Sequence, residues 1–196
     1  MSDFFHIQQK AMQKLMGTES IAERIAQTRC HQFFNATDLE IICGASYFFM
    51  ASTSPAGKPD VSIKAGPAGF VHIEGDSRLI FPDYDGNGMF RSLGNIQATN
   101  FVALLFVEFW AEKRKLRIHG RAKVTRESGL VSLWPGAQLA VTVDVSDIFP
   151  NCPRYLPTLE PVGRSEYVDA LGVAPLEPAW KSKSDLADAV HVRSAY

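Results

Sequence analysis

The feature that most constrains the fold is a strict alternation of residue types in the middle of the chain. From Leu116 to Val124, small or apolar residues take every second position and basic residues stand between them. A period of two places successive side chains on opposite faces of a β-strand. The segment from Leu139 to Val145 repeats the pattern. Two such segments predict antiparallel strands with one buried and one solvated face.

Further segments rich in aromatic and β-branched residues also indicate strands. We predict these strands at 47–53, 60–64, 69–73, 78–81 and 101–107. Turn-forming clusters at 54–59 and 74–77 join the first four into hairpins. The run from Phe101 to Val107 is continuously apolar, which predicts a strand buried on both faces.

Helical signals are strongest before the first strand. Residues 1–30 carry apolar pairs four residues apart, and Ser20–Glu23 and Thr37–Glu40 have the spacing of a capping box. Gly44 is expected to end the second of these helices. Residues 89–98 have helical composition, and a short helix is expected at 184–190. Together the segments predict a mainly β fold, a β-barrel with flanking helices.

Composition excludes several classes of protein. A chain of 196 residues with 46% hydrophobic residues suits one folded domain and excludes disorder. The net charge of −1 argues against a dedicated nucleic-acid binder. The longest apolar run is far shorter than the roughly 20 residues of a membrane helix, and the N-terminus does not resemble a signal peptide. We therefore expect a soluble, cytoplasmic protein that binds neither nucleic acid nor membrane.

Cysteine and histidine spacing indicates neither a disulfide framework nor a metal site. Cys30, Cys43 and Cys152 are widely separated and odd in number, so we expect reduced, buried thiols. The histidines show no ligand spacing, and no metal site is expected.

The most informative local motif is Gly86-Asn87-Gly88 followed by a helix with Arg91 and Ser92 in its first turn. Glycines let backbone N–H groups approach an anion, the helix N-terminus adds partial positive charge, and arginine supplies a forked donor. A phosphate fits such a site. The plain alternative is a strand-to-helix connection with a solvated arginine. The motif is neither a Walker loop nor a dinucleotide loop.

A second motif is the basic strand, defined as Lys113–Lys123. Lys115, Arg117, Arg121 and Lys123 share one face, where like charges repel unless an anion or Asp144 lies opposite. A solvated outer face is the plain alternative. RNA binding is a further one, although no aromatic residues for base stacking are interleaved with the cations.

A third motif follows the last strand. Pro150 and Pro153 restrict the backbone, so that Asn151, Arg154 and Tyr155 are presented on a rigid segment. Cys152 has no base beside it in the motif, and we expect an inert thiol.

Taken together, these segments resemble the pyridoxamine 5′-phosphate oxidase-like family of FMN-binding split barrels. The resemblance covers roughly 46–155. It is carried by GKPDVSIK at 57–64, FPDYDGN at 81–87, RSLGN at 91–95 leading into VALLF at 102–106, RKLRIHG at 114–120 and NCPRY at 151–155. It implies an FMN-binding split barrel at 46–156, N-terminal helices at 1–45 that pack on the barrel, and a C-terminal extension at 157–196, all within one domain.

The resemblance also implies a homodimer with FMN at the subunit interface. The strand from Ser62 would lie along the flavin ring, Arg91 and Ser92 would bind the phosphate, and the segment after the last strand would come from the second subunit. The cofactor-binding residues implied in this way are Ser62, Ile63, Lys64, Ala65, Asp83, Gly86, Asn87, Arg91, Ser92, Lys115, Asn151, Arg154 and Tyr155.

The chain departs from the oxidases of this family at several positions. Ser92 replaces a lysine, Ser62 replaces an arginine, and the C-terminal substrate-binding arginine and histidine have no counterpart. We therefore expect an FMN-dependent oxidoreductase for a small organic substrate other than pyridoxamine 5′-phosphate, and assign no catalytic residue. Alternatives are a flavin or haem carrier or sensor of the same fold, a deazaflavin protein, and an RNA-binding barrel that uses Lys113–Lys123.

Overall fold

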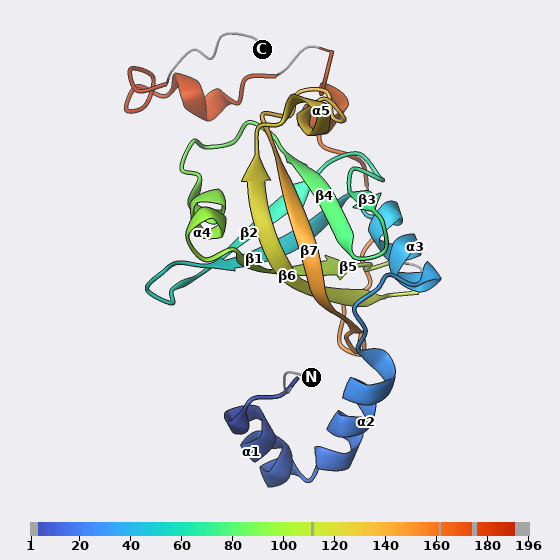
Figure 1. Cartoon of the computed structure of the whole chain (residues 1–196). Coiled ribbons are helices and arrows are strands. Elements are labelled where there is room, and N and C mark those ends of the chain that lie inside the picture. The colour runs from blue at the N-terminus through green and yellow to red at the C-terminus, as the bar shows by residue number, and fades with distance from the viewer. Residues whose placement is uncertain (1–3, 111, 161, 174–175, 191–196) are drawn as a thin grey trace.

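The structure is a computed structural model that describes residues 4–110, 112–160, 162–173 and 176–190. Within these residues, seven strands form one sheet in the order β2-β1-β5-β6-β7-β4-β3, with antiparallel neighbours throughout. The strands are β1 (Tyr47–Thr53), β2 (Pro59–Ala65), β3 (His72–Glu74), β4 (Arg78–Asp83), β5 (Phe101–Val107), β6 (Lys115–Thr125) and β7 (Leu139–Pro150). The sheet curves around a core, as the predicted mainly β fold requires (Figure 1).

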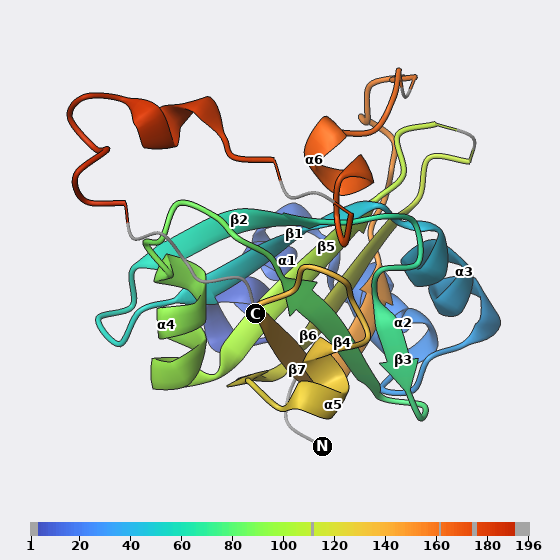
Figure 2. The ribbon, with the colours of Figure 1, turned by 90° about the horizontal axis from the view of Figure 1, so that it is seen from above.

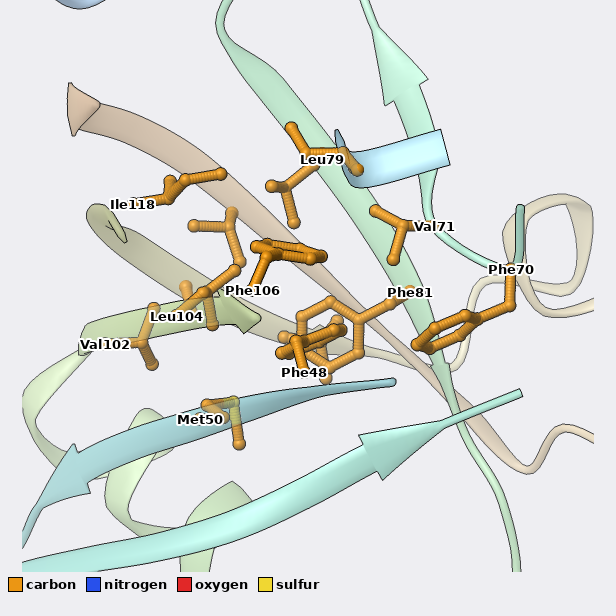
Figure 3. Close-up of a cluster of buried hydrophobic side chains, with 14 of the residues drawn as sticks. Phe48, Met50, Phe70, Val71, Leu79, Phe81, Val102, Leu104, Phe106 and Ile118 are labelled. Atoms are coloured by element: carbon orange, nitrogen blue, oxygen red, sulfur yellow. The ribbon is translucent and has the colours of Figure 1, made fainter. Parts of the chain in front are cut away.

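Aromatic rings fill the centre of the core (Figure 3). The ring centroid of Phe48 lies 5.8 Å from that of Phe70, 5.0 Å from that of Phe81 and 4.9 Å from that of Phe106. These rings come from β1, β4, β5 and the loop before β3, so their contacts join distant parts of the sheet. Removing one such ring costs about 3–5 kcal/mol of stability.

Helices α3 (Ala36–Gly44) and α4 (Arg91–Thr99) lie at opposite flanks of the curved sheet (Figure 2). Helix α3 contributes Ile42 to the core, and α4 contributes Leu93 and Ile96. Helix α4 is also held by the hydrogen bond from Asn95 Nδ2 to Ser52 Oγ (3.1 Å). Burial and hydrogen bonding together fix the position of this helix against β1.

The remaining helices lie at the periphery. Helices α1 (Ile7–Met16) and α2 (Glu19–Arg29) extend away from the sheet, and neither contains a buried residue (Figure 1). Helices α5 (Ser128–Val131) and α6 (Glu166–Asp169) and the 3₁₀ helix at Ala179–Ser182 are short.

The predicted capping boxes are wrong in position. The box of α3 consists of Asn35 and Asp38, not of Thr37 and Glu40, because the Asn35 side chain accepts from the Asp38 amide (3.0 Å). Asparagine is among the strongest N-cap residues, and it begins the helix before Thr37. Helix α2 begins after Thr18 with no side-chain cap, so Ser20–Glu23 forms no box. The prediction that Gly44 ends α3 is confirmed.

Three further predictions need correction. Strand β5 is buried on one face only, and Phe101 on its other face is 56% exposed. Cys43 and Cys152 are free but exposed, and Cys30 is only partly buried, because none of the three points into the core. Residues 184–190 form turns rather than a helix, since Lys183 is extended and a segment this short needs packing to stay helical.

Both alternating segments form the predicted strands. In β6, residues from Leu116 to Ala122 alternate between buried and more exposed positions. The described helices are all too short or too polar to span a membrane.

Candidate functional site

A cavity of about 380 Å³ lies where the two ends of the sheet approach each other. β2 ends the sheet on one side, and β4 is next to the last strand on the other. The cavity is bounded by β2, the end of β4, the loop at 84–90 and the first turn of α4. The predicted site residues that line it are Ser62, Ile63, Lys64, Ala65, Asp83, Gly86, Asn87, Arg91 and Ser92.

The polar wall of the cavity comes from the alternation of β2. Ser62 pairs with Met50 and Lys64 with Phe48, both buried on the inner face of β1. Cross-strand partners share a face, so Ser62 and Lys64 point inward with Asp60. Val61 and Ile63 therefore lie on the outer face, where they are 66% and 60% exposed.

The backbone of β2 also presents hydrogen-bonding groups to the open edge. Gly66 N donates to Ser46 O (3.0 Å) at one end, and Ser54 N donates to Lys58 O (2.9 Å) at the other. Bonded and non-bonded pairs alternate along an antiparallel ladder. The N–H and C=O groups of Val61, Ile63 and Ala65 consequently point away from β1, toward the open side of this edge strand.

An ion pair joins the two ends of the sheet inside the cavity. Lys64 Nζ lies 2.7 Å from Asp83 Oδ1, and the side chains are only 16% and 10% exposed. Lys64 extends from β2 and Asp83 ends β4. The positive charge that β2 brings into the cavity is thus balanced by the carboxylate opposite.

The start of α4 forms the other wall. Phe90 has a left-handed backbone (φ 48°), as has Gly88 (φ 75°), and Phe90 provides no side-chain cap. Such a conformation is strained for a bulky residue, and strained residues often occur at functional sites. Gly86 lines the cavity with open space where a side chain would stand.

Asp60, which the sequence did not single out, binds both residues of the predicted phosphate site. Arg91 Nε lies 3.3 Å from Asp60 Oδ1, and Ser92 Oγ donates to Asp60 Oδ2 (2.9 Å). Ser92 Oγ also lies 3.2 Å from Ser62 Oγ. The available signal was the alternation of Asp60 with Ser62 and Lys64 on one strand.

The C-terminal segment reaches the loop that lines the cavity. Lys181 Nζ lies 2.6 Å from Asp85 Oδ2 and 2.8 Å from Glu177 Oε2. The hydrogen bond that Lys181 donates to Asp85, followed by the one to Glu177, raises its pKa. Two further basic residues of this segment, His191 and Arg193, lie outside the described residues.

Four predicted site residues do not line this cavity. Lys115 and Asn151 are neighbours at the far ends of β6 and β7, where Asn151 N donates to Lys115 O (3.0 Å). Arg154 and Tyr155 follow β7 and are exposed, Tyr155 by 90%. One chain therefore brings together only the predicted site residues of β2, β4, the 84–90 loop and α4.

The basic strand forms most of β6, and its cationic side chains lie on the outer face of the sheet. Arg121 stacks over the Phe101 ring at 4.4 Å and donates to Asn100 Oδ1 (2.9 Å). Asp144 lies opposite Arg121 in the register of β6 and β7, as expected, and its ion pair is with Arg78 (2.6 Å). Among the described residues, no group of His, Cys, Asp and Glu is arranged to hold a metal ion.

Comparisons with known proteins place the fold. A candidate pyridoxamine 5′-phosphate oxidase of Lactobacillus delbrueckii matches with a TM-score of 0.50 and 14% identity, covering 62% of this chain and 99% of its own. HupZ of Group A Streptococcus matches with a TM-score of 0.48 and 15% identity, covering 60% of this chain and 94% of its own. An FMN-binding protein of Syntrophomonas wolfei matches with a TM-score of 0.43 and 11% identity, covering 73% of this chain and 96% of its own. No curated protein sequence matches the chain.

The family assignment rests on the sequence match. The model of the family described as pyridoxamine 5′-phosphate oxidase matches residues 36–141, which is more than half of the chain. This range contains strands β1 to β6, the start of β7 and every residue that lines the cavity. The chain belongs to the pyridoxamine 5′-phosphate oxidase family.

Proposed function

We propose that the chain binds FMN in the β2–α4 cavity and acts as an oxidoreductase on a small organic substrate. The observation that carries this proposal is the pairing of a free sheet edge with an arginine at a helix N-terminus in one cavity of about 380 Å³. A flavin ring needs hydrogen-bonding groups along its edge, and the phosphate needs cationic donors.

The residues present fit these needs. The backbone groups of Val61, Ile63 and Ala65 offer alternating donors and acceptors to a flat ring. Among the described residues, the terminal Nη groups of Arg91 have no hydrogen-bond partner, since only its Nε is bound. These two nitrogens, together with the first turn of α4, would hold the phosphate.

Bound FMN would supply the hydride transfer, and the residues of the chain bind and orient it. The backbone groups of Val61, Ile63 and Ala65 would hold the ring, with the Ser62 hydroxyl and the Lys64–Asp83 ion pair beside it. Burial raises the pKa of Tyr84, which also lines the cavity, so its hydroxyl keeps its proton and can donate a hydrogen bond.

We further propose a homodimer. The outer face of β2, β1 and β5 is apolar: Val61, Ile63 and Phe101 are more than half exposed, and Phe49 and Leu105 are paired beside them. An exposed apolar face of this kind favours association, and an isologous contact would make two equivalent sites. Asn151, Arg154 and Tyr155 of the partner subunit would then reach the cavity, as the family resemblance implies.

Flavin titration tests the cofactor. Quenching of flavin fluorescence should show tight binding of FMN and weak binding of riboflavin. Arg91→Ala should weaken FMN binding roughly tenfold to a hundredfold, because a charge-assisted hydrogen bond contributes about 1.5–3 kcal/mol. Arg126→Ala, at an exposed position outside the cavity, is the matched control. Equal affinity of the unmutated chain for FMN and riboflavin contradicts the proposed phosphate site.

Oxidation of a reduced nicotinamide by the FMN-loaded protein separates an enzyme from a carrier. We do not expect efficient oxidation of pyridoxamine 5′-phosphate. Its own phosphate needs a second anion site, and among the described residues both cations that line the cavity already face a carboxylate. Poor orientation alone can cost about a hundredfold in rate. Turnover of pyridoxamine 5′-phosphate near about 1 s⁻¹, followed by pyridoxal phosphate absorbance, would contradict this expectation.

A further inference from the structure

Asp60 occupies an unusual place for an acidic residue. Its side chain is 19% exposed, it lines the cavity, and it lies at the N-terminus of α4, where a phosphate is expected. Its two oxygens are divided between the two predicted phosphate ligands: Oδ1 lies 3.3 Å from Arg91 Nε and Oδ2 accepts from Ser92 Oγ at 2.9 Å. The carboxylate thus makes the contacts that one edge of a bound phosphate would make.

The hydroxyl of Ser92 cannot serve both anions. A serine hydroxyl has one proton to donate, and here it points to Asp60, with Ser62 Oγ 3.2 Å away. A phosphate that uses Ser92 has to take this hydrogen bond from the carboxylate. One edge of Arg91 is engaged in the same way, and only its terminal nitrogens are available to a ligand.

The charges of the side chains that line the cavity also indicate competition between Asp60 and a bound phosphate. The lining side chains include the carboxylates of Asp60, Asp83 and Asp85 and the cations of Lys64 and Arg91, and Asp85 is paired with Lys181 of the C-terminal segment. Lys64 is held by Asp83 at 2.7 Å, which leaves Arg91 as the cation whose partner a ligand can replace. A dianionic phosphate next to Asp60 is repelled by it, and this repulsion is strong in a partly buried site.

We propose that Asp60 is an internal competitor of the ligand phosphate and sets how strongly the cavity prefers phosphorylated ligands. The carboxylate holds Arg91 and Ser92 at the site and has to yield them to an incoming phosphate. Binding of a weakly charged anion does not compensate for the free energy lost when this ion pair breaks. Binding of a dianionic phosphate that is also held through the ring of its ligand does. The proposal rests on the proposed FMN site and makes Asp60 a specificity-determining residue.

The test compares FMN, riboflavin and inorganic phosphate on the full chain and on Asp60→Asn, which keeps the shape and can still accept from Ser92. We expect FMN to bind about tenfold more tightly to Asp60→Asn and riboflavin to bind within twofold of the unmutated chain. Inorganic phosphate, tested by thermal denaturation, should stabilise the variant and leave the unmutated chain unchanged. Asp76→Asn, which removes the same charge from the exposed β3–β4 turn, should change none of these quantities.

The outcomes separate the two proposals. If the unmutated chain binds FMN and riboflavin equally, the phosphate site itself is wrong. If it prefers FMN but Asp60→Asn binds FMN with unchanged or lower affinity, the cofactor site stands and competition by Asp60 is refuted. Should Asp60→Asn fail to fold, judged by circular dichroism, Asp60→Ser removes the charge with a smaller side chain and takes its place under the same criteria.

Discussion

At the scale of single residues, His119 links stability to pH. Burial lowers its pKa; Asp147 opposes this shift and Arg117 adds to it. The folded state therefore binds the proton less well than the unfolded state does. As the pH falls through the ordinary histidine range, the unfolded state takes up the proton first and stability declines; above that range the penalty is absent.

We expect the free energy of unfolding to fall between about pH 7 and pH 5 and His119→Gln to flatten this dependence. Urea unfolding across the pH range measures it. His72→Gln is the control, because His72 lies exposed at the start of β3. An unchanged slope in His119→Gln would show that another group carries the dependence.

The part of the candidate site that lies in one short sequence motif was predictable from the sequence. The part that depends on strand register and on contacts between distant elements was not. Gly86, Asn87, Arg91 and Ser92 stand close together in the sequence, and all line the cavity. Asp60 is some thirty positions away, and only the register of β2 and the placement of α4 bring it to Arg91 (3.3 Å). Ion pairs across a barrel are set by tertiary structure, so no sequence window contains them.

At the scale of elements, the contact of β6 with β7 depends on one glycine. The register of the two strands shifts between His119 and Gly120, so β7 carries an extra residue there. A Cβ on Gly120 would collide with the carbonyl oxygen of Asp144 and the side chain of Val143. Bulges of this kind bend a strand and need close backbone approach.

Gly120→Ala should therefore destabilise the protein by about 2 kcal/mol or more. Gly94→Ala is the matched control, since a Cβ on Gly94 in α4 meets no atom within 4 Å. It should stabilise by about 0.5–1 kcal/mol, because alanine favours helix. Thermal and urea denaturation measure both changes, and effects of the same sign in the two variants would contradict this role of Gly120.

Most elements were predictable, and the errors have physical causes. Alternation over long segments identified β6 and β7, because a period of two over many residues is typical of a strand with one buried face. The error at β5 is more informative. Its apolar residues occupy both faces, yet in one chain the outer face from Phe101 onward is not buried. The sequence pattern of β5 is that of a covered strand, which fits a partner on this face.

At the scale of the whole molecule, the apolar outer face and the position of four predicted site residues outside the cavity both fit the proposed dimer. Phe49 and Leu105 pair across β1 and β5, and Val61 and Phe101 extend the face on either side. Lys115, Asn151, Arg154 and Tyr155 lie outside the cavity of their own chain. A two-fold contact through the apolar face would cover the first group and bring the second toward the cavity of the partner.

Phe101→Lys should therefore separate the dimer and weaken FMN binding together, although Phe101 lies outside the cavity. Lysine at this position places a charge within an apolar contact and beside Arg121, whose guanidinium lies over the ring at 4.4 Å. Light scattering should give twice the 21.7 kDa chain mass for the unmutated protein and the chain mass for the variant. Glu127→Lys, which introduces the same residue with an even larger change of charge at an exposed position before α5, should stay dimeric with unchanged FMN affinity. A flavin-loaded monomer of the unmutated chain would refute the shared site, because one chain would then suffice to hold the cofactor.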